Sequence, residues 1–305
     1  MIAIFLQTLP FFALIGLGWF AGRIKFFPPQ ATAYLTKFVF FFPLSAMLFQ
    51  FTSTLDIESL FDPAFVAAYV LGSVVLWLVG FGVARTRGEP ISLAAMEAHT
   101  GMTGNTGFLG VPMLAAILGE RAVGPILMVL TSDLVIFAAL ITIVITGSRQ
   151  GRIAVAPIAL GLIKNPMIVS MGAGMIWSVL HLPMPQPLLQ MVTILGAAAT
   201  PGALFAIGAT LATLRLTRLG PAIWLSGVKL ILHPLAVAAT SLLIFGVDPF
   251  AAGVMIGASA LPVAGNVYML AQHYNVGTER VSAAIFVSTA FSILTLPFVL
   301  SWVHG

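Results

Sequence analysis

The sequence contains no cysteine and few charged residues. Among its 305 residues only 7% are charged, against about 25% in a typical soluble domain. The absence of thiols excludes a disulfide framework and thiolate metal sites. Because 60% of the residues are hydrophobic and the mean hydropathy is +1.09, we predict an integral membrane protein embedded in a lipid bilayer. We expect no metal and no organic cofactor.

Motifs of membrane-embedded enzymes and of ATP-driven pumps are missing as well. The chain has no His-Glu-x-x-His, no Gly-x-Gly-Asp and no Gly-x-x-x-x-Gly-Lys-Ser/Thr phosphate loop. We therefore predict that the protein is not an enzyme. The pI near 9.8 would be consistent with a protein that binds nucleic acid, but the basic residues lie in short loops between apolar segments. The positive-inside rule explains them better, so no nucleic-acid partner is expected.

Apolar segments of about 20 residues, the length that a membrane span needs, fill most of the chain. Ten are predicted, at residues 4–22, 31–52, 63–84, 91–118, 121–147, 155–180, 187–211, 221–246, 250–274 and 279–302. The first lacks the basic region and the cleavage site of a signal peptide and is interpreted as a retained span. The predicted fold class is an all-α membrane protein with ten transmembrane helices.

Charge alternates between successive loops. The basic set comprises Arg23, Lys25, Arg85, Arg87, Arg149, Arg152, Arg215, Arg218 and Arg280. The other set comprises Asp56, Glu58, Asp62, Glu120 with Arg121, and Asp248. By the positive-inside rule the basic loops are cytoplasmic, which places both termini outside.

The fourth apolar segment is interrupted at residues 104–112, which read GNTGFLGVP. The run contains helix breakers, among them Gly110 and Pro112, and the hydrogen-bonding side chains of Asn105 and Thr106. In hydrocarbon, irregular backbone survives only where it lines a cavity or is buried in protein. This stretch is therefore predicted to be a substrate-binding site in a broken helix.

The two halves of the chain repeat each other. Pro10, Gly16 and Gly18 recur as Pro166, Gly172 and Gly174, an offset of 156 residues that also lays residues 110–115 over 266–271. Each copy holds five predicted spans, an odd number, so the second copy enters the membrane from the opposite side. This predicts an inverted repeat of residues 1–150 and 151–305, with the substrate site at the repeat interface.

The ninth segment carries the second copy of the broken stretch. Its residues 258–266 contain Pro262, Gly265 and Asn266 in the middle of an apolar run. Paired interruptions in two halves indicate a transport site formed by crossing, discontinuous helices. Asn105 and Asn266 would then offer amide donors to a carboxylate beside half-helix N-termini. In the alternative interpretation, each amide only satisfies backbone groups that its own break frees.

Ionisable side chains within the spans are candidates for ion coupling or for ion pairs. Asp133 lies near the middle of the fifth span, where a carboxylate costs about 2.5–3.5 kcal/mol and should face a partner or water. Lys229 and His233 share one helix face, and either could pair with Asp133. A fixed structural pair and a proton or sodium coupling site are the two interpretations. Glu97 and His99 lie nearer the cytoplasmic end of the fourth span. Glu97 is interpreted as an interfacial carboxylate that snorkels toward water. The alternative is that the two residues take part in a proton relay, since histidine titrates near neutral pH.

Prolines are expected to kink two further spans near the site. Pro43 lies in the second span and Pro201 in the seventh. Ser45 follows Pro43, and its hydroxyl could reach the substrate or bond back to its own helix.

Several of these motifs resemble the auxin efflux carrier family, which includes the plant PIN-FORMED carriers. The fourth-segment run at 105–112, Asn165-Pro166, Ala260-Leu261-Pro262 and Thr295-Leu296-Pro297 carry the resemblance, which covers essentially the whole chain. The resemblance implies a scaffold of spans 1, 2, 6 and 7, commonly dimeric. It also implies a transport domain of spans 3–5 and 8–10 that moves like an elevator. The short linker at 147–155 is typical of a compact bacterial-type member of the inner membrane.

The sequence therefore predicts a secondary transporter of a small organic anion, because members of the family that it resembles carry auxin, malate or malonate. Moving one charge through 100 mV is worth about 2.3 kcal/mol, so anion export from a negative cell interior is electrically downhill. Uptake would need co-transported H⁺ or Na⁺. One alternative is a sodium- or proton-coupled organic anion symporter of the bile-acid-symporter type, and another is a membrane ligand sensor that does not transport.

Overall fold

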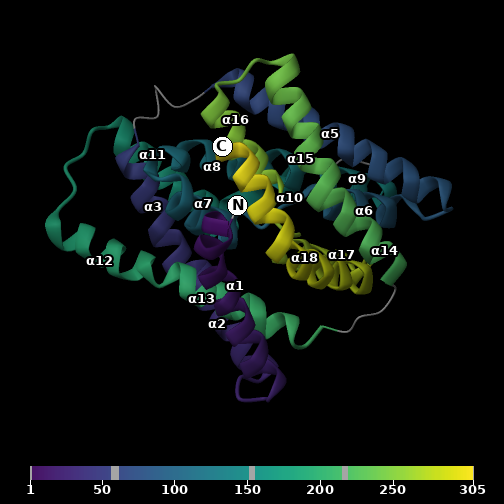
Figure 1. Cartoon of the computed structure of the whole chain (residues 1–305), viewed down its shortest axis with the longest axis horizontal. Coiled ribbons are helices and arrows are strands. Elements are labelled where there is room, and N and C mark those ends of the chain that lie inside the picture. The colour runs from purple at the N-terminus through teal and green to yellow at the C-terminus, as the bar shows by residue number, and fades with distance from the viewer. Residues whose placement is uncertain (1, 56–61, 151–154, 215–218, 305) are drawn as a thin grey trace.

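The computed structural model describes residues 2–55, 62–150, 155–214 and 219–304, and these fold into helices and turns without a β-strand (Figure 1). Within these ranges, seven helices are long and apolar enough to cross a membrane, or eight if one bent pair counts as a single span. The predicted all-α, multi-pass class is confirmed. Five charged residues of the alternating loops lie outside the described residues: Asp56, Glu58, Arg152, Arg215 and Arg218.

The helices of the first half are α1 (Ile2–Arg23), α2 (Pro29–Phe41), α3 (Pro43–Thr54), α5 (Pro63–Thr86), α6 (Ile91–Met102), α7 (Val111–Leu118), α8 (Val123–Ser132) and α9 (Ala138–Gln150). Four of them, α2, α3, α5 and α7, begin with proline at one of their first two positions. The π-helical turn η1 (Thr106–Gly110) precedes α7, the short η2 (Glu120–Ala122) precedes α8, and the π-helical turn η3 (Asp133–Phe137) joins α8 to α9. Pro43 opens α3, where its missing N–H loses no helical bond. Asp62 caps α5 by accepting the Ala64 N–H at 2.8 Å.

The helices of the second half lie between residues 155 and 304. They are α10 (Val155–Lys164), α11 (Pro166–Val179), α12 (Gln186–Ala197), α13 (Ala199–Leu211), α14 (Leu219–Gly227), α15 (His233–Ala238), α16 (Pro249–Ser259), α17 (Gly265–Tyr274) and α18 (Thr278–His304). The π-helical turns η4 (Val228–Leu232) and η5 (Ala239–Ile244) flank α15. The bent pair is α10 and α11, which meet at 70°. Asn165 caps α11 there, since its side chain accepts the Met167 N–H at 3.0 Å.

The helices pack in two groups, and each group draws on both halves of the chain (Figure 1). In one group α1 packs on α13, and α3 packs on α11 and α12. In the other α5 packs on α6 and α15, and α18 packs on α14 and α16. Glycine allows the closest approaches: a Cβ at Gly18 would collide with the Phe205 backbone of α13, and one at Gly174 with the Phe49 backbone of α3.

The two interrupted segments break and then cross. α6 ends at Met102 and η1 begins at Thr106, while α16 ends at Ser259 and α17 begins at Gly265. Each half is too short to count as a span, which is why the fourth and ninth predicted spans are missing from the seven.

Backbone groups that the two breaks free are paired with each other. The Asn105 N–H donates to the Pro262 carbonyl at 2.9 Å, and the Ala264 N–H donates to the Thr103 carbonyl at 3.1 Å. Gly104 and Val263 form an antiparallel β-bridge between the two segments, and the Val263 N–H donates to Ser288 Oγ of α18 at 3.0 Å. Irregular backbone can lie among the spans because its polar groups find partners within the protein.

Candidate substrate site at the helix crossing

Three side-chain amides line a small cavity at the crossing. Asn105 directly precedes η1 and makes no capping bond, Asn266 lies in the first turn of α17, and Asn165 caps α11. The cavity measures about 60 Å³, and Phe108 stacked on Phe40 forms part of its wall, with ring centroids 6.0 Å apart. The backbone groups that the two breaks free pair with each other across the crossing. The side-chain amides of Asn105 and Asn266 are therefore not needed to cap a helix.

Two larger cavities continue from this one. A cavity of about 120 Å³ along α13 shares Asn105, Phe108 and Asn266 with it. A cavity of about 330 Å³ between α9, α10 and α17 shares Asn165, Asn266 and Asp133 with it. Asn266 lines all three, and the largest falls in the range of about 300–1,000 Å³ that is typical of small-molecule sites.

Among the described residues that line these three cavities there is no Arg or Lys. Among their described lining residues the ionisable groups are Asp133, His99 and His273, with the phenols of Tyr268 and Tyr274. An anion bound here would therefore be held by amide groups and by helix N-termini. Two such N-termini are present, at Thr106–Leu118 and at α17, and each carries a partial positive charge of about +0.5.

The remaining residues predicted for the site lie at or beside the crossing, with the exception of Ser45. Gly110 closes η1 by donating to the Asn105 carbonyl at 2.9 Å, and a Cβ there would lie 2.5 Å from Leu261. Thr106 is buried, and its hydroxyl has no hydrogen-bond partner among the described residues. Ser45 is not brought to the site: its hydroxyl donates to the Phe40 carbonyl of its own chain segment at 3.2 Å, and it lines none of the three cavities.

Three further predicted residues shape the backbone at the breaks. Pro112 stands in the first turn of α7, Pro262 supplies the carbonyl that accepts the Asn105 N–H, and Gly265 opens α17. A Cβ at Gly265 would meet nothing within 4 Å, so no neighbour demands glycine there.

Asp133 opens the π-helical turn η3 and lines two of the cavities. Its Oδ1 accepts a hydrogen bond of 2.7 Å from the Tyr69 hydroxyl of α5, whereas its buried Oδ2 has no partner among the described residues. π-Helical turns frequently occur at functional sites because they displace one residue out of helical register. Here the displaced turns hold Thr106, Asp133 and Lys229.

Lys229 lies behind the crossing, fully buried. Its ammonium donates to the Ser259 carbonyl at the C-terminal end of α16 and lies 3.1 Å from His233 Nδ1. Lys229 and Asp133 interact electrostatically, but among the described residues neither Lys229 nor His233 approaches Asp133 within ion-pair distance. The physical reason is that the end of α16 offers the ammonium a partial negative charge.

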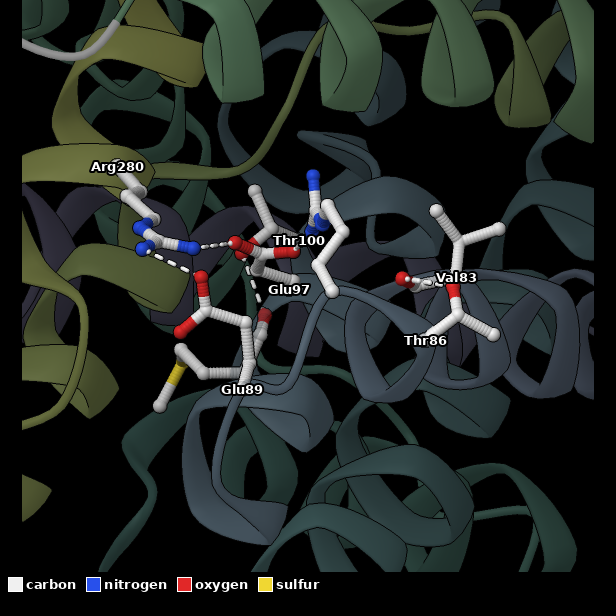
Figure 2. A network of polar contacts seen from close by, with 8 residues as sticks. Val83, Thr86, Glu89, Glu97, Thr100 and Arg280 are labelled. Carbon is white, nitrogen blue, oxygen red and sulfur yellow. Dashed lines mark hydrogen bonds and ion pairs between the residues drawn. The ribbon is translucent and has the colours of Figure 1, made fainter.

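Glu97 of α6 belongs to a separate ion-pair cluster (Figure 2). Its carboxylate pairs with Arg87, which follows α5, and with Arg280 in the first turn of α18. Arg280 also pairs with Glu89 at 2.8 Å. The snorkelling carboxylate predicted at Glu97 is wrong, because its side chain is only 2% exposed and is neutralised inside the protein. His99 is not part of this cluster: it lines the cavity between α9, α10 and α17, beside Thr103.

Several of these residues were not predicted for the site. Asn165 could have been found, since Asn before Pro in an apolar run is an N-cap signal. Arg87 and Arg280 were read only as loop charges. Tyr69 gives no sequence signal, because one tyrosine in an apolar span looks like core packing.

Two comparisons show which known proteins the chain is similar to. The family model described as "Membrane transport protein" matches residues 3–300. A protein of Rhizobium meliloti (strain 1021) named "Putative malonate transporter" is 30% identical over 295 residues, which cover 95% of this chain and 92% of that protein.

Proposed function

We propose that this chain, which belongs to the membrane transport protein family of auxin efflux carriers, is a secondary transporter that moves a small organic anion by alternating access. The observation that carries the proposal is the cavity at the crossing, where the free amides of Asn105 and Asn266 meet from two broken helices. Amide donors and helix N-termini suit a carboxylate. The name of the Rhizobium meliloti relative supports a carboxylate as well.

The proposed architecture has ten spans in two inverted five-span repeats, residues 1–150 and 151–305. The reciprocal packing supports it: α1 of the first repeat packs on α13 of the second, and α11 of the second packs on α3 of the first. Gly18 and Gly174, which are 156 residues apart, make the matching close contacts. The two packing groups correspond to a scaffold of spans 1, 2, 6 and 7 and a moving transport domain of spans 3–5 and 8–10. A homodimer in the bacterial inner membrane, with both termini outside, completes the proposal.

Asp133 is the residue through which a proton-coupled variant of the same function would act. Its carboxylate lines the cavity, where it would repel a bound anion unless it took up a proton. If Asp133→Asn leaves transport as dependent on a proton or sodium gradient as in the wild type, this coupling role is refuted. Lys229 argues against a sodium ion at the end of α16, because its ammonium already occupies that place.

A thermal-shift screen of purified protein tests the substrate site directly. The ligands are mono- and dicarboxylates, including malonate, malate and indole acetate, and the hit is then measured in proteoliposomes. Asn105→Ala should weaken its binding about 10- to 150-fold, which corresponds to the loss of one hydrogen bond to a charged group, about 1.5–3 kcal/mol. Gln272→Ala is the matched control, since it removes an exposed amide of α17 outside the cavities.

Two results would contradict the proposal. If Asn105→Ala keeps the wild-type affinity, the amide does not bind the anion. If the ligand binds but no flux appears in proteoliposomes, the protein is a sensor and not a transporter.

A further inference from the structure

Three buried side chains lie between Asp133 at the cavity and Lys229 behind the crossing. Tyr69 donates to Asp133 Oδ1 at 2.7 Å, and its ring lies 6.0 Å from the His233 ring. Ser73 stands one helical turn further along α5, on the same helix face as Tyr69. Ser73 Oγ is 2.9 Å from His233 Nε2, and His233 Nδ1 is 3.1 Å from Lys229 Nζ. Polar side chains therefore form a row from the ammonium to the carboxylate, in which Tyr69 and Ser73 are neighbours on one face of α5.

The chemistry of the two ends fixes the direction of every hydrogen bond in this row. An ammonium can only donate and a carboxylate can only accept. Lys229 therefore donates to Nδ1 of His233, which leaves the imidazole proton on Nε2, pointing at Ser73. Ser73 then donates toward Tyr69, and Tyr69 donates to Asp133. All donors point the same way, as a single concerted proton shift requires.

We infer that Tyr69, Ser73 and His233 form a proton path that carries a proton from Lys229 to Asp133 when an anion enters the cavity. In the shift, Lys229 gives a proton to His233 Nδ1, and His233 gives its Nε2 proton to Ser73. Ser73 passes its own proton to Tyr69, and Tyr69 passes its proton to Asp133 Oδ1. The products are a neutral lysine, the other imidazole tautomer and a carboxylic acid, and no proton enters or leaves the protein.

The cavity explains why an anion would drive this shift, an argument that rests on the proposed function. Asp133 lines the cavity, whereas Lys229 lies behind it. Moving the proton to Asp133 removes a like charge beside the anion and brings positive charge closer to it. A protonated Asp133 can also donate a hydrogen bond to a carboxylate.

Two measurements on the purified protein, with malonate as the probe, test the inference. Infrared difference spectroscopy should show a band of a protonated carboxylic acid when malonate binds, and the band should be missing in Asp133→Asn. A pH indicator in weakly buffered solution should show no proton uptake by the wild type. Tyr69→Phe and Ser73→Ala each cut the path, so Asp133 must take its proton from solution. These variants should take up about one proton per bound malonate.

Ser241→Ala is the control for removal of a buried serine, since its hydroxyl donates to the Ala238 carbonyl of its own helix. It should behave as the wild type does. The inference is overturned if malonate binding gives no acid band in the wild type. Proton uptake by the wild type, or its absence in both path variants, overturns it equally. If neither malonate nor any other carboxylate shifts the melting temperature, the proposed function itself fails, and the path has no anion to respond to.

Discussion

Glu97→Gln should destabilise the protein strongly, because it removes the shared acid of a buried cluster. The Glu97 side chain is 2% exposed and pairs with Arg280, which is 13% exposed, and with Arg87, which is 35% exposed. Breaking a buried ion pair by removing one partner costs about 3–5 kcal/mol. Arg87 is well solvated and adds at most about 1 kcal/mol, and Arg280 keeps its bond to Glu89. The lower end, about 3 kcal/mol, is therefore expected.

The assay is thermal unfolding in detergent, followed by the fluorescence of the five tryptophans. A loss of about 3 kcal/mol corresponds to a fall in Tm of about 6–12 °C, at about 2–4 °C per kcal/mol. Glu89→Gln is the matched control: its side chain is 21% exposed and pairs with Arg280 alone among the described residues, so its cost should stay near or below about 1 kcal/mol. The double variant Glu97→Gln with Arg280→Gln should cost less than the sum of the two single variants, since either change alone already breaks the Glu97–Arg280 pair.

Two results would refute this reasoning. The first is a Tm for Glu97→Gln no lower than that for Glu89→Gln, which would mean that the cluster is solvated. The second is strict additivity in the double variant, which would mean that the carboxylate and the guanidinium do not interact.

Three further predictions concern packing at the crossing and between the two groups of helices. Gly110→Ala places a Cβ about 2.5 Å from Leu261, so overpacking should cost about 1–3 kcal/mol in thermal unfolding and slow transport in proteoliposomes. Gly18→Leu should prevent accumulation of folded protein, as measured by gel filtration, whereas Gly16→Leu should not, because a Cβ at Gly16 meets nothing within 4 Å. Ser288→Ala should cost about 1–3 kcal/mol in the same unfolding assay, because it leaves a buried N–H of the second break without its acceptor.

Hydropathy and helix-breaking residues were sufficient to predict the membrane class and the positions of both breaks. The runs around Gly110 and Pro262 gave strong local signals because glycine and proline act on the backbone where they stand. The predicted cavity amides Asn105 and Asn266 do line one cavity. Its binding role remains a proposal.

Partners that depend on three-dimensional packing could not be predicted. Helix spacing shows that Lys229 and His233 share a face, but not that the end of α16 meets that face. Likewise, the position of Glu97 in its span suggested an interfacial side chain. Its two arginine partners, Arg87 and Arg280, are 10 and 183 residues away in the sequence. The sequence predicts which residues share a helix face. Which charged groups become partners depends on how the helices pack against each other, which the sequence alone does not show.

The crossing also explains how cavities whose described lining has no Arg or Lys can suit an anion. Four half-helix ends meet there, and their dipoles would largely cancel if all of them faced the same space. The positive N-terminal ends, at Asn105 and Gly265, line the cavities. The negative end of α16 is covered from behind by the Lys229 ammonium, and the Thr103 carbonyl at the end of α6 accepts the Ala264 N–H. The positive ends of the helix dipoles therefore face the cavities, while the negative ends are neutralised within the protein. An anion can then bind without a cationic side chain as its ion-pair partner, and such a partner would hold it too firmly for release.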